Sequence, residues 1–205
     1  MSELSQTKEK IFDTFVEMVS TLGYENVTTR DIAKRIGINA ASIYYHFESK
    51  EKILEFAYSY YLQHQYDNRT PVQEAQNSLE TAKADEIVPL LRYSFMSQDQ
   101  KKYTRMILIT KIIYMRIFQD PVAGKMFSES SADSVEYVAS ILRHGVDIGR
   151  ISSDFDLTTF ATLLVDSMMM MGVKAFARTD YNVGQLEQEE YICAMLTALI
   201  STALL

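Results

Sequence analysis

The sequence predicts an all-α protein, and two observations carry this prediction. The 205 residues include only 7 Gly and 3 Pro, too few for an all-β chain, which needs a turn every ~8 to 12 residues. Apolar residues instead recur at spacings of three and four along the chain, as on one face of a helix. With 47% hydrophobic and 23% charged residues, the composition is that of a folded globule. We expect about nine helices.

The first helix is predicted from about Thr7. Ile11, Phe15 and Leu22 recur there at helical spacing. Gly23 follows directly and suits a left-handed C-terminal cap.

A second, short helix is predicted to begin near Thr29. Thr28 stands three residues before Asp31, the spacing of a capping box, in which two side chains satisfy backbone N–H groups at a helix start. Gly37 comes two turns later and can adopt the positive φ that ends the helix.

A third helix is predicted over about residues 40–47, capped by Asn39. The small Ala33 would allow close approach of the two helices, and Ile43 would fill their crossing. Two short helices joined by a Gly-containing turn are typical of a helix-turn-helix. An ordinary corner between two helices is the alternative.

Basic charge is concentrated at this motif. The chain has a formal net charge of -7, which should repel nucleic acid in general. Residues 28–52 nevertheless hold five basic and three acidic residues, a local net of +2. Residues 51–205 carry a net of -6, so electrostatic attraction to DNA is expected only at the N-terminal motif.

A known family has a similar motif. Residues 28–54, TTRDIAKRIGINAASIYYHFESKEKIL, resemble the DNA-binding motif of the TetR family of transcriptional regulators. The resemblance covers about residues 10–55 and is much weaker beyond. It implies a helix-turn-helix DNA-binding domain over 1–48 and an effector-binding and dimerisation domain over 49–205. Ala41 is a departure, because the family often has Gly there, and its methyl group would face the DNA.

Base contacts are expected from the start of the third helix if that helix enters the major groove. Alanine can contact only a thymine methyl group there, and Ser42 can bond to almost any base. We therefore expect Tyr45, with Arg30 or Lys34, to supply much of the specificity.

Phosphate contacts are implied by the resemblance for Tyr44 and His46. Lys50 adds a cation and free backbone N–H groups at the start of the fourth helix. Local packing is the alternative for both tyrosines of the motif. The candidate DNA-contacting residues are Thr29, Arg30, Lys34, Ala40, Ala41, Ser42, Tyr44, Tyr45, His46 and Lys50.

The rest of the chain is predicted to form further helices, and some of them are apolar on nearly every side. They are expected over about 50–68, 84–97, 103–117, 132–149, 157–176 and from 191 onward. The last two are too apolar for one small interior, so a partner subunit related by two-fold symmetry is expected to cover them. Dimers built from the last two helices are also what the resemblance implies. A monomer with one crowded core is the alternative. The candidate interface residues are Leu163, Met169, Met170 and Leu199.

A small effector between the fourth to eighth helices is implied by the resemblance. The Met and Tyr content of those helices favours an apolar or aromatic molecule. The same residues at helical spacing also build ordinary cores. The candidate effector-binding residues are Tyr60, His64, Phe95, Tyr103, Met106, Thr110, Tyr114 and Met168.

Catalytic and metal-binding patterns are not found in the sequence. The three His have no ligand-like spacing, and neither a Gly-rich phosphate loop nor a G-x-S-x-G elbow occurs. We therefore predict no enzyme activity, no metal and no cofactor. A single cysteine, no secretory leader and no membrane-spanning stretch favour the cytoplasm.

The sequence thus predicts a homodimeric, ligand-responsive repressor that binds a palindromic operator. The alternative is a helical ligand-binding or interaction module whose helix-turn-helix is purely structural.

Overall fold

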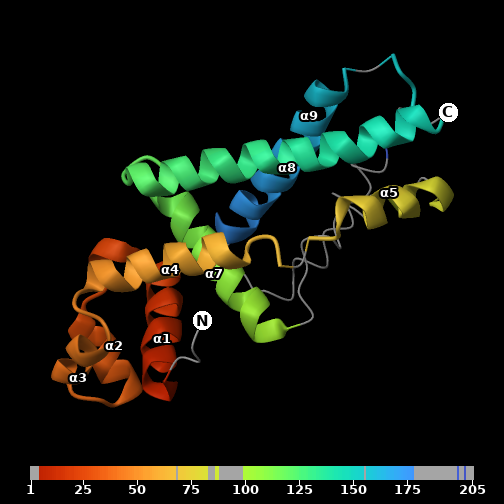
Figure 1. Ribbon diagram of the computed structural model, residues 1–205. Helices are drawn as coiled ribbons and strands as arrows, with labels where there is room; N and C mark the ends of the chain where they lie inside the picture. The colour runs from red at the N-terminus through yellow and green to blue at the C-terminus, as the bar shows by residue number, and fades with distance from the viewer. Residues whose placement is uncertain are drawn as a thin grey trace. The chain divides into compact units, whose positions relative to one another are not determined.

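The computed structural model describes residues 5–67, 69–82, 86–87, 99–154, 156–177, 198 and 201 (Figure 1). Its elements are helices, which confirms the all-α prediction. The described part contains eight α-helices and one short 3-10 helix, against the nine helices predicted for the whole chain. They are α1 (Gln6–Leu22), η1 (Tyr24–Asn26), α2 (Thr29–Ile36), α3 (Ala40–His46), α4 (Lys50–His64), α5 (Val72–Thr81), α7 (Gln100–Arg116), α8 (Pro121–Asp147) and α9 (Leu157–Ala177).

Two compact units make up the chain. The first comprises residues 1–67 and 98–124, and the second comprises residues 68–97 and 125–205. The first unit therefore continues past the predicted domain boundary at residue 48 and includes α4 and α7 beside the helix-turn-helix.

Helix α1 begins as the sequence predicts but ends differently. The Ser5 hydroxyl accepts a hydrogen bond from the Lys8 N–H at 3.3 Å, which caps its start. At its end Gly23 has φ 85° and ψ 151°, so it is not in the left-handed helical region that we predicted. The φ is still positive, which favours glycine at this position. The chain then leaves α1 in an extended direction toward η1.

The predicted capping box at the start of α2 is confirmed. The Thr28 hydroxyl accepts from the Asp31 N–H at 3.2 Å, and the Asp31 carboxylate accepts from the Thr28 N–H at 3.0 Å. Gly37 ends the helix in the left-handed conformation, with φ 72° and ψ 33°. The Asn39 side chain then caps α3 by accepting from the Ala41 N–H at 3.0 Å. Both short helices therefore have the predicted ends.

The core of the first unit is formed by α1 and the helices that pack on it. Ala33 and Ile43 are buried where α2 meets α3, as the sequence predicts. The Phe12 and Phe56 rings lie 4.9 Å apart in an edge-to-face arrangement that joins α1 to α4. Ile109 and Ile113 of α7 are also buried. This packing fixes the helix-turn-helix within a larger helical unit.

Helix α4 is shorter than predicted, ending at His64 rather than near residue 68. The Asp67 N–H bonds to the His64 carbonyl at 3.1 Å, which closes a tighter turn after the helix. In addition, the Asp67 carboxylate binds both His64 and Lys102. These contacts stabilise the turn that follows His64, and the helix ends there.

The second unit has its own core, formed by α5, α8 and α9. Helix α9 contributes four buried residues to this core, Phe160, Ala161, Leu164 and Val165. All four belong to the apolar face of α9 that was predicted to point inward. The other members of this core include Ala75, Leu79, Tyr137, Val138, Leu142 and Ile151.

Two features of α5 and α8 were not predicted. Helix α5 lies in a segment for which no helix was expected, because Ala75 and Leu79 are its only buried residues. Helix α8 begins at Pro121, eleven residues before the predicted start at residue 132. Asp120 precedes it, and its carboxylate accepts from the Val122 N–H at 2.9 Å. An acceptor followed by proline is a helix-start signal.

Two predicted helices lie largely outside the described residues. They are the helix over 84–97, of which only residues 86–87 are described, and the helix from residue 191 onward. Among the residues that are described, no helix combines the length and the apolar character needed to cross a membrane.

Candidate nucleic-acid interface

The exposed side of α3 carries the residues that were predicted to read bases. Ala41 is exposed, and Tyr45, one turn later on the same side, is 88% exposed. Ile43 is fully buried on the other side of the helix. Ala40 and Ser42 are half-buried. The side of α3 facing solvent is therefore formed mainly by Ala41 and Tyr45.

A side-chain contact joins α2 to α3 at this surface. The Thr29 Oγ1 and the Tyr44 hydroxyl lie 3.1 Å apart, within hydrogen-bonding distance. Tyr44 remains 54% exposed, so its ring is accessible while its hydroxyl has a fixed partner. His46 is half-buried, and its ring packs edge-to-face on Tyr45 at 5.1 Å.

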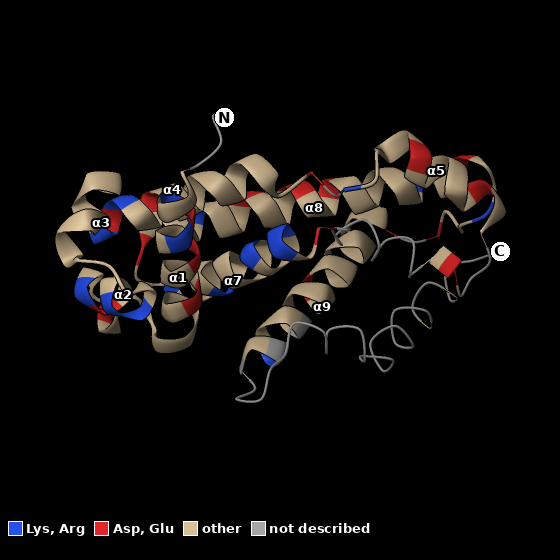
Figure 2. Ribbon diagram, turned by 90° about the horizontal axis from the view of Figure 1, so that it is seen from below, with Lys and Arg blue, Asp and Glu red and all other residues tan. Residues whose placement is uncertain are grey.

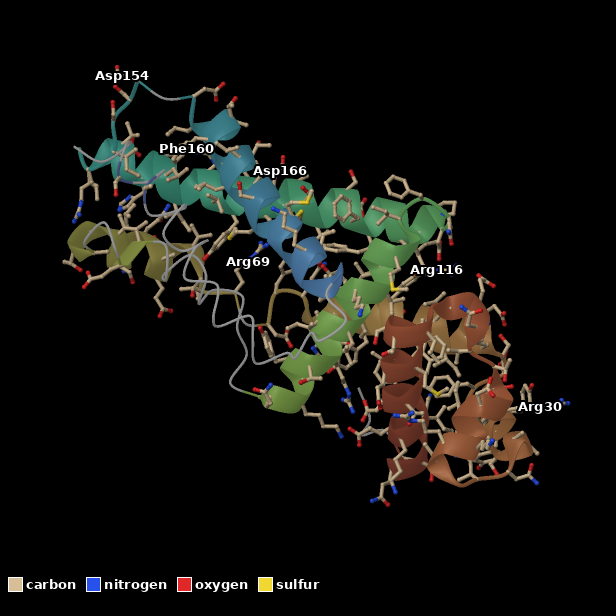
Figure 3. All side chains as sticks on the ribbon, turned by 180° about the vertical axis from the view of Figure 1, so that it is seen from behind. Arg30, Arg69, Arg116, Asp154, Phe160 and Asp166 are labelled. Atoms are coloured by element: carbon tan, nitrogen blue, oxygen red, sulfur yellow. The ribbon has the colours of Figure 1, made fainter. Side chains whose placement is uncertain are left out.

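The basic residues of the motif fall into two groups. Arg35 is paired with Glu17 at 2.6 Å and Lys52 with Glu55 at 2.7 Å. Arg30 and Lys34 are exposed and form no salt bridge with the residues that the structure describes. Figure 2 shows the basic residues on α2, and Figure 3 shows Arg30 pointing away from the surrounding helices. Among the described residues, Arg30 and Lys34 are therefore the cations of α2 that are exposed and not held in a salt bridge.

Lys50 is held by a residue that the sequence did not single out. Its Nζ donates to the Tyr24 carbonyl at 3.0 Å and lies 3.9 Å from the centre of the Tyr24 ring. The structure places this ammonium against η1. The Tyr24 hydroxyl donates to Glu51 at 3.1 Å. Burial, with the nearby Glu51 carboxylate, raises the pKa of Tyr24 to about 12, so the phenol stays neutral.

Most candidate effector-binding residues lie on α4 and α7 of the first unit. Tyr60 is buried, with its ring 5.5 Å from Phe12 and 4.4 Å from His64. Tyr103, Met106, Thr110 and Tyr114 are half-buried on α7. Met168 belongs to the second unit, where it packs against the core, and Phe95 is outside the described residues.

A polar contact already engages two of these residues. The Thr110 hydroxyl donates to the Met106 carbonyl at 2.8 Å within α7. Burial raises the pKa of Tyr114 to about 12, so this side chain also stays neutral at physiological pH.

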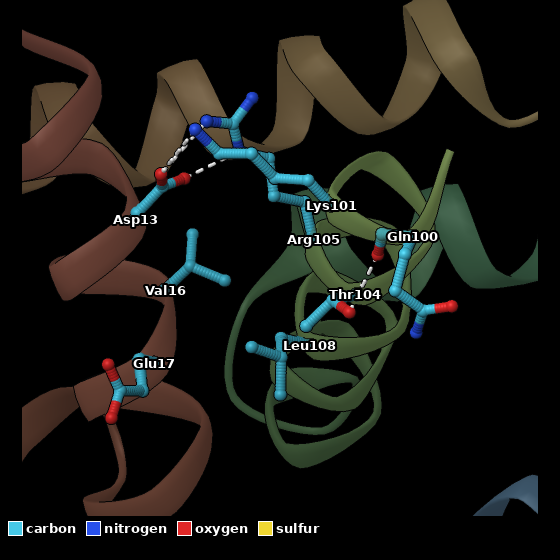
Figure 4. A pocket seen from close by; sticks show the side chains of 8 residues that line it. All are labelled: Asp13, Val16, Glu17, Gln100, Lys101, Thr104, Arg105 and Leu108. Carbon is cyan, nitrogen blue, oxygen red and sulfur yellow. Dashed lines mark hydrogen bonds and ion pairs between the residues drawn. The ribbon is translucent and has the colours of Figure 1, made fainter. Parts of the chain in front are cut away.

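An open cavity of about 530 Å³ lies between α1 and α7 (Figure 4). None of the predicted effector-binding residues lines it. Its lining residues are Asp13, Val16, Glu17, Gln100, Lys101, Thr104, Arg105 and Leu108.

Ion pairs join α1 and α7 at one end of this cavity. Arg105 contacts Asp13 at 2.5 and 2.9 Å and Glu9 at 2.6 Å. Lys101 lies 2.9 Å from Glu9 and 3.5 Å from Asp13. These four residues form the α1–α7 clasp. Its two hydrogen-bonded cations lower the pKa of Glu9 to about 2.

The candidate dimer residues differ in exposure. Leu163 and Met170 are 48% and 54% exposed on α9, and Val173 beside them is 42% exposed. Met169 is placed differently from the prediction, because it packs against the core of the second unit. It follows the buried Val165 by four residues, which puts both on one side of the helix. Leu199 lies outside the described residues.

Comparison with known proteins identifies the N-terminal helices. Residues 11–56 match the family model described as bacterial regulatory proteins of the tetR family. Over 48 residues, 23% of this chain, the sequence is 48% identical to the biofilm operon icaADBC HTH-type negative transcriptional regulator IcaR of Staphylococcus aureus. The match spans about a quarter of that relative's length, 26%.

Solved structures share the fold along the whole chain. The ketosteroid transcriptional regulator KstR2 of Mycobacterium tuberculosis has a TM-score of 0.65 at 15% identity, covering 99% of this chain and 97% of that one. A transcriptional regulator from Saccharomonospora viridis in complex with choline has a TM-score of 0.64 at 20% identity, covering 97% of each chain.

The fold and the N-terminal match together define a helix-turn-helix segment of the kind that bacterial regulatory proteins of the tetR family contain. Residues 11–56 are similar to the DNA-binding segment of the tetR family, as the sequence motif predicts.

Proposed function

We propose that this protein is a homodimeric repressor that binds a palindromic DNA operator and leaves it when a small molecule binds. The observation that carries the proposal is the accessible surface of α3 and α2. Tyr45 at 88% exposure and Tyr44 at 54% are large side chains that a purely structural helix-turn-helix would be expected to bury. Arg30 and Lys34 add accessible positive charge on α2.

Repression is supported by the function of one relative. IcaR is a negative regulator that matches this chain in the DNA-binding segment. That segment is the part of the chain from which operator binding is inferred. Because its proposed target is DNA, the cytoplasm is the proposed location of the protein.

The dimer is supported by α9. Leu163, Met170 and Val173 form an exposed apolar surface on a helix whose other side is buried, and such a surface favours association. With two-fold symmetry, two copies of α3 would contact two half-sites. The operator is therefore expected to be palindromic.

The effector is proposed to be apolar or aromatic. The buried Tyr60 of α4 and the half-buried Tyr103, Met106 and Tyr114 of α7 are aromatic residues or Met, which suits such a molecule. Two proteins of this fold are described with chemically different small molecules, a ketosteroid regulator and a choline complex.

The test is selection of bound genomic fragments with the purified protein, followed by fluorescence anisotropy on the recovered sequence. Nanomolar binding at physiological salt to a palindrome, with much weaker binding to a scrambled duplex, is expected. The variant Tyr45→Ala should lose most of this preference while remaining helical by circular dichroism. Equal, weak binding to both duplexes would contradict operator recognition.

A further inference from the structure

A cluster of charged and aromatic residues connects the start of α4 to the end of α7 inside the first unit. Its centre is the ring of Tyr24 in η1. The Lys50 Nζ lies 3.9 Å from the centre of that ring, and the Arg116 guanidinium carbon lies 4.3 Å from it. Both are within the distance of a cation–π interaction. One aromatic ring therefore holds a cation from α4 and a cation from α7.

Each of these side chains has further partners that fix its position. The Tyr24 carbonyl accepts from Lys50 at 3.0 Å, and its hydroxyl donates to Glu51 at 3.1 Å. Arg116 is 14% exposed and pairs with Asp120 at 3.3 Å and Glu25 at 3.5 Å. The cluster is therefore tied to η1, α4 and α7.

The ammonium of Lys50 retains binding capacity in this arrangement. A lysine ammonium has three N–H donors, and the structure shows one of them given to the Tyr24 carbonyl. The side chain is half-buried rather than enclosed. The remaining donors can contact an anion, and a side chain that is already fixed loses little rotamer freedom when it does so.

We propose that Tyr24 is a positioning residue for a DNA phosphate contact made by Lys50, and that Arg116 connects this contact to α7. The proposal rests on the proposed function, since it assumes that the first unit binds DNA. It gives α7 a direct physical route to the DNA-binding surface. A displacement of α7 would move Arg116, release Tyr24 and leave Lys50 without its fixed position.

A double-mutant cycle on the full-length protein tests the assignment. The variants are Tyr24→Leu, Lys50→Gln and their combination, measured on the selected operator by fluorescence anisotropy over a range of salt concentrations. Tyr24→Leu removes the ring contact but keeps the backbone carbonyl, so it should weaken binding by about 3- to 30-fold, where the upper value corresponds to the full rotamer freedom of one lysine side chain. In the Lys50→Gln background the same substitution should change affinity less than about twofold, because the residue being positioned is gone.

Salt dependence provides an independent readout of Lys50. Lys50→Gln should reduce the slope of log K against log salt by about 0.9 for each Lys50 in contact with phosphate. Lys125→Gln is the matched control, because it removes the same charge from an exposed side chain on α8, and it should leave the slope unchanged. Tyr24→Phe keeps the ring and the backbone carbonyl, so it should retain wild-type affinity.

The variant Arg116→Gln provides a second cycle if Tyr24→Leu does not fold. Its effect on affinity should likewise be present with Lys50 and absent in the Lys50→Gln background. An equal loss of affinity in both backgrounds, for either substitution, would show a general structural role and overturn the positioning role. Wild-type protein that selects no operator would instead refute the proposed function itself.

Discussion

The Tyr44 hydroxyl lies 3.1 Å from the Thr29 Oγ1, which braces the exposed surface of α3 against the first turn of α2. This contact fixes a ring that is 54% exposed. The hydroxyl has one donor and two acceptor sites, so it can bind a second partner without leaving Thr29.

Tyr44→Ala should weaken binding to all DNA sequences by a similar factor, because a phosphate contact carries no base information. Anisotropy measurements on the operator and on a scrambled duplex provide the check, with circular dichroism to confirm folding. The conservative variant Thr29→Val should give a smaller loss, since it removes the brace and keeps the Tyr44 hydroxyl. Unchanged affinity of Tyr44→Ala for both duplexes would exclude a phosphate role.

The methyl group of Ala41 leads to a prediction about bases. Ala41 is exposed one turn before Tyr45, and an alanine in the major groove can contact only the thymine C5-methyl group. Replacing single operator thymines with uracil removes that group and keeps base pairing. One thymine per half-site should show a loss of affinity with wild-type protein and none with Ala41→Gly. If no uracil substitution affects wild-type binding, Ala41 does not read a thymine.

The local parts of the fold were predictable because their signals are contained within a few residues. Thr28 and Asp31 specify the start of α2, and Gly37 specifies its end, through backbone hydrogen bonds and a positive φ. The start of α8 could have been predicted from Asp120 and Pro121, an acceptor followed by proline. Our prediction relied on apolar periodicity, which begins later in this helix.

Contacts between distant segments could not be predicted in the same way. Lys50 and Tyr24 are 26 residues apart, and Arg105 and Asp13 are 92 residues apart. A charged residue on a predicted helix gives no indication of which opposite charge it will meet. The sequence therefore identified Lys50 as a candidate for DNA contact but could not show that Tyr24 holds it.

Acid should weaken the α1–α7 clasp. Its cations lower the pKa of Glu9 to about 2, from an ordinary value of 4.5. A carboxylate with a lowered pKa contributes stability above its unfolded pKa, and this contribution is lost as the pH falls through the folded value. Glu9→Gln should therefore lower the denaturant midpoint at pH 7, and its difference from wild type should shrink between about pH 4.5 and pH 2.

The control for this prediction is Glu55→Gln, which removes an exposed ion pair with Lys52 on a single helix. Exposed pairs contribute at most about 1 kcal/mol, so this variant should change stability little. Glu9 is itself one-third exposed, and solvent screening limits the size of its effect. A Glu9→Gln difference that stayed constant down to pH 2 would count against the clasp.

Two substitutions on α9 should separate folding from assembly. Leu164 is 2% exposed in the core of the second unit, so Leu164→Ala should cost ~2 to 5 kcal/mol of stability. Met170 is 54% exposed, and Met170→Glu should shift the dimer toward monomer with little loss of helix content. Analytical ultracentrifugation measures the assembly, with Thr158→Glu as a control at another exposed position of α9. A stable Met170→Glu dimer would place the interface elsewhere.

Release from DNA by an effector is the last expectation to be tested. A ligand shifts the protein away from DNA only if it binds the non-binding conformation more tightly. A coupling free energy of ~1 to 3 kcal/mol corresponds to a ~5- to 150-fold loss of operator affinity. A thermal-shift screen of apolar and aromatic compounds should identify ligands, and titration of the operator with each stabilising compound should show this loss.

The position of the effector can be probed in the same titrations. Tyr60 is buried among aromatic rings of the first unit, whereas Thr110 and Met106 are half-buried on α7. Met106→Ala should raise the effector concentration needed for release while leaving effector-free DNA affinity unchanged. The exposed Lys125 of α8 offers a control, since Lys125→Gln should change neither quantity. If every stabilising compound left operator affinity unchanged, release by apolar effectors would be refuted, and the aromatic cluster around Tyr60 would serve packing alone.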